Sequence, residues 1–156
     1  YHYPKNRFVA GFIGSPKMNF ISVQVEALDA ARVQVKLSNG STFWIPVDSA
    51  GVTVGERMSL GIRPEHLLST DKTDASIEGD VQIVEKLGNE TQVYLHLDCA
   101  DADVIYRAQD TLPIEPGQTY TIGIAPERCH LFHSNGVACQ RLHRENGVDF
   151  DHLYQP

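Results

Sequence analysis

Apolar and polar side chains alternate with a period of two along much of the chain. The alternation is clear over residues 20–25 and 33–37, and it resumes over residues 42–47 after a Ser-Asn-Gly-Ser turn at residues 38–41. Because successive side chains of a strand point to opposite faces of a sheet, this period predicts strands with one buried face. Asn-Gly accepts positive φ angles and favours a tight chain reversal. The same reasoning predicts further strands over residues 58–62, 77–85, 92–97, 104–107 and 120–124.

Short strands at this spacing, with no long amphipathic helix between them, predict an all-β fold of closed or nearly closed antiparallel barrels. The start of the chain differs from the rest. Asn6 is a suitable N-cap, Gly14 is a suitable stop, and Phe8 and Phe12 fall on one helical face. A short helix is therefore predicted before Pro16, which cannot continue it.

An internal repeat organises the strands. The sequence Gly-Ile-Arg-Pro-Glu at residues 61–65 returns 62 residues later as Gly-Ile-Ala-Pro-Glu at residues 123–127, and Gly55 matches Gly117 at the same spacing. Proline lacks the N–H that a central ladder needs, so each copy predicts a strand that ends at its proline. Repetition on this scale predicts one barrel motif used twice.

The repeat divides the chain into three predicted segments. Residues 1–15 are a linker with the short helix, residues 16–142 form the β-barrel domain with packed halves near 18–75 and 77–135, and residues 143–156 are a polar tail. The first residues include no initiator Met and do not resemble a signal peptide, so we expect the chain to be part of a longer protein.

Charge and composition argue against several classes of function. A formal net charge of −7 repels a phosphate backbone, which disfavours nucleic-acid binding. No apolar run approaches the roughly 18–20 residues that a membrane-spanning helix needs. The three cysteines, Cys99, Cys129 and Cys139, have no disulfide-framework spacing, so we expect reduced thiols in a cytosolic protein.

Candidate chemistry along the chain is sparse. Residues 11–17 lack the Gly-x-x-x-x-Gly-Lys-Ser/Thr pattern of a phosphate-binding loop, so we expect this chain neither to bind nor to hydrolyse ATP. Cys129, His130, His133 and Cys139 do not match the usual pair spacing of a structural zinc site. We therefore predict no catalytic, cofactor-binding or metal-ligating residues.

Glu65 and Glu127 invite comparison with paired catalytic carboxylates. They occupy equivalent places in the repeat, so a shared role in a turn is the simpler interpretation. Phe43 and Trp44 are neighbours on a predicted strand, so one of them should face the core and the other a partner. Residues 88–91, Gly-Asn-Glu-Thr, are expected to form a turn.

Longer motifs carry more information than composition does. Residues 61–67 are Gly-Ile-Arg-Pro-Glu-His-Leu, residues 84–91 are Val-Glu-Lys-Leu-Gly-Asn-Glu-Thr, and residues 126–132 are Pro-Glu-Arg-Cys-His-Leu-Phe. With the stretches at residues 3–20 and 138–143, these motifs resemble the C-terminal regulatory domain of ATP-binding subunits from bacterial sugar importers of the maltose/maltodextrin type. The resemblance runs from residue 1 to about residue 148.

The resemblance implies OB-fold-like (TOBE-type) barrels with a regulatory and dimerising role. The parent subunit would be an ATPase on the cytoplasmic face of the inner membrane, and it would bind ATP and Mg²⁺ outside this chain. Implied partners are a second copy, the membrane-spanning importer subunits, the glucose-specific enzyme IIA of the phosphotransferase system and the maltose-regulon transcription activator.

The resemblance also implies a regulatory surface, residue by residue. The positions that match the family's response to enzyme IIA are Arg7, Phe20, Gly55, Ser59, Gly61, Gly79 and Glu85. The positions tied to the activator are Trp44 and Gly123. For the glycines a scaffold role is equally open, because glycine is often needed for backbone geometry alone.

Two other functions stay open from the sequence. One is the regulatory domain of a related sugar or glycerol-phosphate importer subunit. The other is a free-standing barrel that binds a small ligand, because this fold class hosts many ligands.

Overall fold

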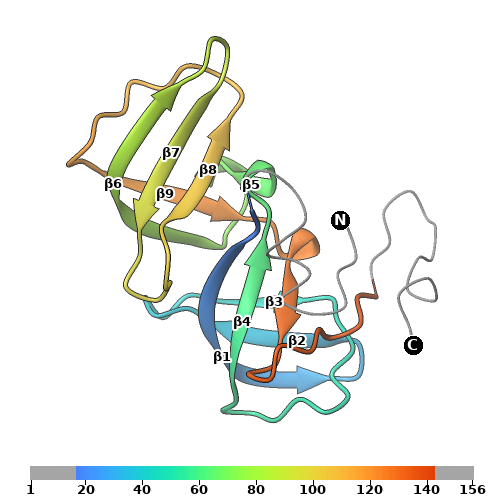
Figure 1. Cartoon of the computed structure of the whole chain (residues 1–156). Coiled ribbons are helices and arrows are strands. Elements are labelled where there is room, and N and C mark those ends of the chain that lie inside the picture. Colours follow the sequence, from blue (N-terminus) through green and yellow to red (C-terminus); the bar gives the residue numbers. More distant parts are fainter. Residues whose placement is uncertain (1–16, 143–156) are drawn as a thin grey trace.

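The computed structural model describes residues 17–142, and within this range the regular elements are β-strands and 3₁₀ helices of three residues. The predicted helix over residues 6–14, the linker and the tail lie outside the described residues. Strands occur at every predicted position, which confirms the all-β assignment. They form two five-stranded antiparallel sheets, arranged as two barrel-like halves (Figure 1).

The first sheet holds four strands from the first half of the chain and β10 from its end. Its order is β10-β4-β1-β2-β3. Burial alternates along β2, β3 and most of β1, as the period of two predicted, whereas all three residues of β10 are buried. The strands are β1 (Asn19–Asp29), β2 (Arg32–Lys36), β3 (Thr42–Ile45), β4 (Arg57–Ile62) and β10 (His130–Phe132).

The second sheet repeats this arrangement with four strands from the second half and β5 from the first. Its order is β5-β9-β6-β7-β8, so β6 takes the place of β1 and β9 the place of β4. The 3₁₀ helix η1 (Pro64–His66) follows β4, and η3 (Pro126–Arg128) follows β9. The strands are β5 (Leu67–Leu68), β6 (Ser76–Lys86), β7 (Thr91–His96), β8 (Val104–Ala108) and β9 (Thr119–Ile124).

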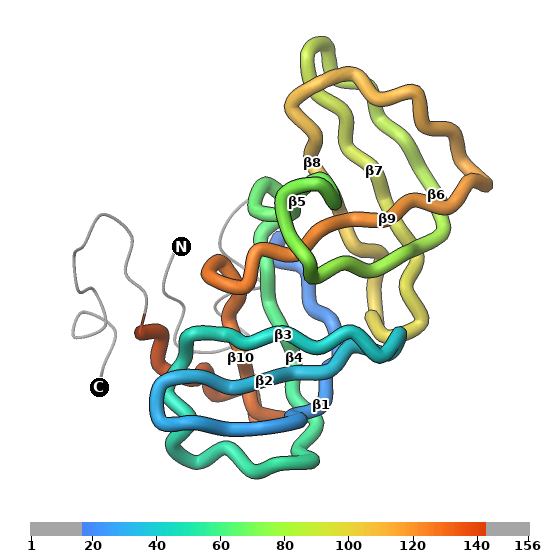
Figure 2. The backbone as a smooth tube through the Cα atoms, turned by 180° about the vertical axis from the view of Figure 1, so that it is seen from behind, coloured from blue at the N-terminus to red at the C-terminus, as the bar shows by residue number. Residues whose placement is uncertain are grey.

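The two halves exchange their last strands. β5 follows β4 in the chain but pairs with β9, and β10 follows β9 but pairs with β4, as the path of the chain shows (Figure 2). Gly61 lies opposite His130, and Gly123 lies opposite Leu68. The two glycines are 62 residues apart in the sequence, and so are the residues that they face. The predicted halves near 18–75 and 77–135 are therefore interlocked in the structure, each completing the sheet of the other.

Both long first strands carry the same irregularity. The register shifts between Val25 and Ala27 in β1, and between Val81 and Ile83 in β6. In each case the carbonyl before the shift accepts a hydrogen bond from a turn glycine, Gly55 in the first half and Gly117 in the second. A bulge of this kind bends a strand and increases its twist. Each long strand can therefore pair with one neighbour along its first part and with another along its second part.

Buried side chains from both halves form one continuous core. Val23 and Leu60 of the first sheet and Leu95 and Ile122 of the second belong to the same cluster, and each has an exposed fraction of 0%. A smaller cluster of Met18 and Phe132 lies beside it. A shared core means that the halves are expected to unfold together rather than as separate domains.

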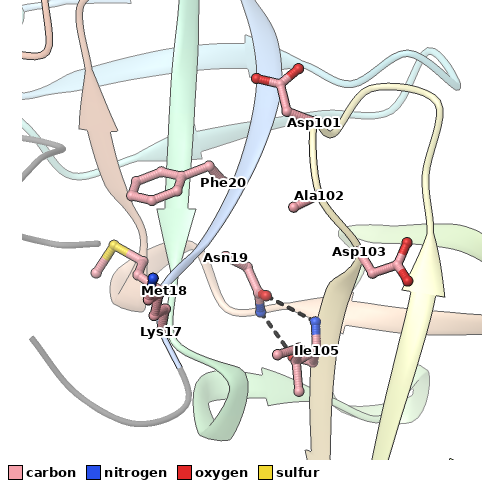
Figure 3. A pocket seen from close by; sticks show the side chains of 8 residues that line it. All are labelled: Lys17, Met18, Asn19, Phe20, Asp101, Ala102, Asp103 and Ile105. Carbon is pink, nitrogen blue, oxygen red and sulfur yellow. Dashed lines mark hydrogen bonds between the residues drawn. The ribbon is translucent and has the colours of Figure 1, made fainter. Parts of the chain in front are cut away.

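A buried asparagine joins the two sheets. Asn19 at the start of β1 donates from Nδ2 to the carbonyl of Ile105 and accepts from the Ile105 N–H at Oδ1, both at 2.8 Å (Figure 3). Its amide thus pairs with the outer edge of β8 as a strand would. The N–H of Ser22 adds a second link to the carbonyl of Cys99 at 2.8 Å.

We expect Asn19→Ala to lower the free energy of unfolding by about 2–4 kcal/mol, because both backbone groups of Ile105 lose their partner. Urea unfolding would measure the change. Asn39→Ala is the control, since its amide reaches the Ser76 carbonyl across the same two halves but at an exposed site. That variant should lose less than about 1 kcal/mol. Equal losses in both variants would contradict a special role for Asn19.

Candidate functional site

Three of the nine predicted regulatory residues lie together where β1 pairs with β4. Phe20 is opposite Gly61, and Ser59 is opposite Ser22 two pairs further along the ladder. The Phe20 ring packs edge-on against Phe132 of β10, with 5.8 Å between the ring centroids. This group therefore sits where the exchanged strand β10 joins the first sheet.

A cleft of about 300 Å³ opens beside Phe20, at the joint between the two halves (Figure 3). One side comes from the start of β1, and the other comes from the β7–β8 loop and the start of β8. Asn19 in its wall is already bonded to Ile105, so its amide is engaged within the fold. The lining residues are Lys17, Met18, Asn19, Phe20, Asp101, Ala102, Asp103 and Ile105.

Three of the predicted glycines are closely packed. A Cβ atom at Gly61 would lie 2.6 Å from Sδ of Met18 and 2.9 Å from Cε2 of Phe132. At Gly79 it would lie 2.7 Å from Cδ2 of Leu97, with the His96 carbonyl oxygen at 3.0 Å. A side chain at Gly61 would have to displace the side chains of Met18 and Phe132, whereas one at Gly79 would also meet the backbone of His96.

Gly123 is equally confined. A Cβ atom there would lie 2.5 Å from Cγ2 of Thr73 and 3.0 Å from the carbonyl oxygens of Leu68 and Ser69. Gly61, Gly79 and Gly123 are all buried, so any role of theirs in regulation would act through backbone packing rather than through direct contact with a partner.

Gly55 requires glycine for a different reason. It is exposed with open space around its Cα, but its φ of +91° lies in the left-handed region. Its repeat partner Gly117 has a φ of +92°. The two turns are also closed alike, by Glu56 accepting from the Thr53 N–H and by Gln118 accepting from the Glu115 N–H.

Glu85 lies far from Phe20, near the end of β6. It is exposed, and its carboxylate accepts a hydrogen bond from the Tyr94 hydroxyl, which raises the pKa of Tyr94. Ile83 and Leu87 beside it are exposed by 50% and 45%. Sequence alternation places Ile83 in the core with Val81, but the bulge between them turns Ile83 outward.

Trp44 lies on β3, the edge strand of the first sheet. The Arg32 guanidinium lies over its ring at 4.4 Å from the centroid, and Arg32 is itself paired with Asp29 at 2.7 Å. Phe43 next to it is buried, which confirms that the two aromatic residues face opposite sides. β3 is separated from β4 by two strands, so Trp44 is not part of the group around Phe20. Arg7 lies outside the described residues.

The candidate chemical groups occupy structural positions. Glu65 and Glu127 lie in the equivalent 3₁₀ helices η1 and η3, as the repeat predicted. Burial holds the pKa of Cys129 well above its usual range and raises that of Cys139 to about 12, so both remain thiols.

Within residues 17–142, no group of three His, Cys, Asp or Glu side chains is arranged to hold a metal ion. The same range contains no helix with the length and apolar character to cross a membrane.

Comparison with known proteins finds sequence similarity to ATP-binding subunits of sugar importers. Residues 14–67 match the model of the MalK OB fold domain, and residues 60–132 match that of the TOBE domain. The maltose/maltodextrin import ATP-binding protein MalK of Vibrio cholerae is 70% identical over 149 residues, and that of Salmonella typhimurium is 55% identical over 148. The alignments cover 96% and 95% of this chain, but the chain spans 40% of the length of each relative.

A solved structure supports the fold independently. The cytoplasmic molybdate-binding protein ModG aligns with 81% of this chain and 99% of its own, with a TM-score of 0.61. Its sequence identity is 18%, so this similarity concerns the arrangement of strands alone. The sequence similarity, in contrast, covers nearly the whole chain. The chain is therefore a C-terminal MalK-like domain formed by the OB-fold and TOBE parts.

Proposed function

We propose that this domain is the regulatory and dimerising part of the ATP-binding subunit of a bacterial maltose/maltodextrin importer. The observation that carries the proposal is identity of 55–70% to MalK proteins across almost all of the chain. The whole subunit would act at the cytoplasmic face of the inner membrane with membrane-spanning partners. ATP and Mg²⁺ would bind to a part of the subunit outside this chain.

The domain would dock two regulators on separate surfaces. Phe20 and its cleft, together with Glu85 at the end of β6, would respond to the glucose-specific enzyme IIA. Trp44, with Gly123 as a packing residue, would serve the transcription activator. The position of Trp44 on a strand remote from β4 supports this separation, because two partners would then not compete for one patch.

A free-standing ligand-binding barrel is less well supported. Such a site needs several polar groups that converge on the ligand. In the cleft beside Phe20, the amide of Asn19 is bonded to the backbone of Ile105. Lys17, Asp101 and Asp103 also line the cleft, but their charges are of both signs. We therefore take the apolar surface of the cleft as better suited to an apolar side chain of a protein partner than to a small polar ligand.

Charge reversal at Glu85 would test the enzyme IIA surface. We expect Glu85→Lys to weaken capture of purified enzyme IIA by about tenfold, as loss of an interface contact worth ~1.4 kcal/mol does. Glu78→Lys is the matched control, because Glu78 and Glu85 are both exposed on β6, and this variant should bind normally. A thermal melt reports folding. Equal loss of binding in both variants would point to net charge rather than a specific contact.

Substitutions at Gly55 and Gly117 would distinguish a docking role of Gly55 from a purely structural one. Gly55→Ala and Gly117→Ala should each destabilise the domain by roughly 1–2 kcal/mol, because alanine is strained at positive φ. If Gly55 belongs to the docking surface, its substitution alone should also weaken enzyme IIA capture. Parallel loss of binding in both variants would assign Gly55 to the scaffold.

Self-association follows from the proposed role. Two acidic copies repel at low salt, so we expect dimerisation to strengthen as salt screens the charge over a Debye length of ~8 Å. An affinity in the micromolar range corresponds to about −8 kcal/mol. Analytical ultracentrifugation over a concentration series measures it. A monomer at every concentration and salt level would place dimerisation outside this chain.

A further inference from the structure

The indole of Trp44 is held against a cation. The guanidinium carbon of Arg32 on β2 lies 4.4 Å from the centroid of the Trp44 ring on β3. Nε and Nη2 of Arg32 both donate to Oδ2 of Asp29, at 3.0 and 2.7 Å. A guanidinium has five N–H groups, so three of them remain for another acceptor. Trp44 is half-buried and Arg32 is exposed, so both side chains reach the surface together.

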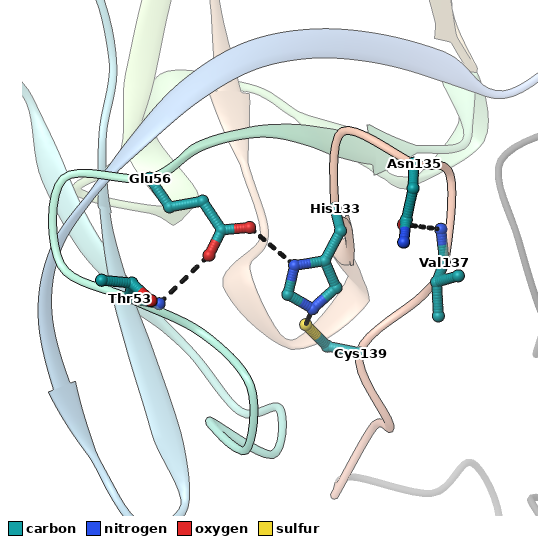
Figure 4. Close-up of polar contacts among 6 residues, drawn as sticks. All are labelled: Thr53, Glu56, His133, Asn135, Val137 and Cys139. Atoms are coloured by element: carbon teal, nitrogen blue, oxygen red, sulfur yellow. Dashed lines mark hydrogen bonds and ion pairs between the residues drawn. The ribbon is translucent and has the colours of Figure 1, made fainter.

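The turn between β1 and β2 does not need the contact of Asp29 with Arg32. Oδ1 of Asp29 accepts from the Ala31 N–H at 2.9 Å, which closes the turn by itself. The contact also differs from the one between Glu56 and His133, where Oε2 lies 2.6 Å from Nδ1 (Figure 4). That contact fastens segments 77 residues apart, whereas Asp29 and Arg32 are three residues apart. Their pairing therefore serves to place the guanidinium over Trp44 rather than to hold the fold.

The repeat shows what the frame itself requires at these positions. Counting along each ladder from the last pair before its bulge, Trp44 on β3 corresponds to Ile105 on β8, and Arg32 on β2 corresponds to Gln92 on β7. The second half thus builds the same sheet with an aliphatic and a neutral side chain. The stacked cation and indole are an addition of the first half, and the sheet does not depend on them.

The outer face of β2 around Trp44 carries two cations. Burial alternates along β2, so Arg32, Gln34 and Lys36 share this face, and Gln34 lies directly opposite Trp44 on β3. Arg32 and Lys36 are then the two diagonal neighbours of Trp44, one on each side, and long side chains reach across such diagonals. The indole therefore lies between two basic residues.

Acidic groups on neighbouring elements do not cancel this charge. Asp29 is engaged by Arg32. Glu26 lies on β1, and β2 separates that strand from β3. The 3₁₀ helix η3, which contacts β3, carries Glu127 and Arg128, one charge of each sign. The surface around Trp44 is therefore locally positive on a chain whose formal net charge is −7.

We propose that this surface, defined as Arg32, Gln34, Lys36 and Trp44, docks an acidic segment of the transcription activator. The inference rests on the docking role of Trp44 proposed above and adds the chemistry that the partner must present. An apolar side chain of the segment would pack on the indole, and its carboxylates would accept hydrogen bonds from Arg32 and Lys36. Most of the acidic domain would repel such a segment, so the local charge would also determine where it docks.

Quenching of tryptophan fluorescence would measure the local charge, because Trp44 is the one tryptophan of the chain. Iodide is attracted by positive charge and acrylamide is neutral, so the ratio of their quenching constants reports the potential at the indole. We expect Arg32→Met to lower this ratio about twofold and Asp29→Asn to raise it. Lys86→Met removes a charge from an exposed position on β6 and should leave it unchanged. An unaltered ratio in Arg32→Met would overturn the proposal.

Binding of the purified activator, measured by titration calorimetry at low and high salt, would test the partner. We expect Arg32→Met and Lys36→Met each to weaken binding by about three- to tenfold at low salt, and the double variant to lose most of the wild-type salt dependence. Trp44→Ala should weaken binding by about tenfold or more. Lys86→Met is the matched control and should bind like the wild type, and thermal melting reports the folding of every variant.

The docking role and the acidic partner fail in different ways. If Trp44→Ala binds the activator normally, the docking role of Trp44 is wrong and this inference is wrong with it. If Trp44→Ala loses binding while Arg32→Met and Lys36→Met keep it, with the salt dependence of the wild type, docking at Trp44 stands and the acidic segment is excluded. Quenching of Trp44 by single-stranded oligothymidylate, with no response to the activator, would assign the surface to base stacking and would also overturn the proposal.

Discussion

The exchange of the fifth strands is the constraint on which the rest of the domain depends. β5 and β10 each leave the half that precedes them in the chain and complete the sheet of the other half. They pair at Gly123 and Gly61, where a side chain would collide with Thr73 or Met18. Neither half has its full sheet without the other, so the two share one core and one cooperative unit. A regulatory surface on such a unit is presented by a rigid frame rather than by two movable parts.

This frame changes how the predicted regulatory residues should be understood. Phe20, Glu85 and Trp44 expose part of their side chains, so they are the positions where a partner would make direct contact. Gly61, Gly79 and Gly123 are buried where strands pack most closely, and substitutions there would act on the surface by moving its supports. Both kinds of residue would influence docking, but a substitution at the exposed Glu85 would change the stability of the domain least.

The sequence predicts the strands, the repeat and the turn glycines because these depend on residues near one another in the chain. It does not predict which sheet β10 joins, because the pairing of His130 with Gly61 is fixed by the three-dimensional path of the chain. The outward position of Ile83 follows from a bulge, and one inserted residue reverses the face of every side chain after it. The bonds of Asn19 to Ile105 and of Glu56 to His133 span 86 and 77 residues, beyond the reach of any local pattern. The docking residues stay a prediction that rests on family resemblance.

The differences between the two halves are as informative as their symmetry. The same turn is closed by a carboxylate at Glu56 and by an amide at Gln118, with almost the same geometry at the glycine before it. Because the backbone does not need the charge, the charge has to be explained by what Glu56 meets across the chain, and that group is His133. The same argument applies to Trp44 on β3. Its ring packs against the guanidinium of Arg32, and both residues belong to the first half of the repeat. In a duplicated frame, positions that differ between the copies without structural need are where separate functions can be placed.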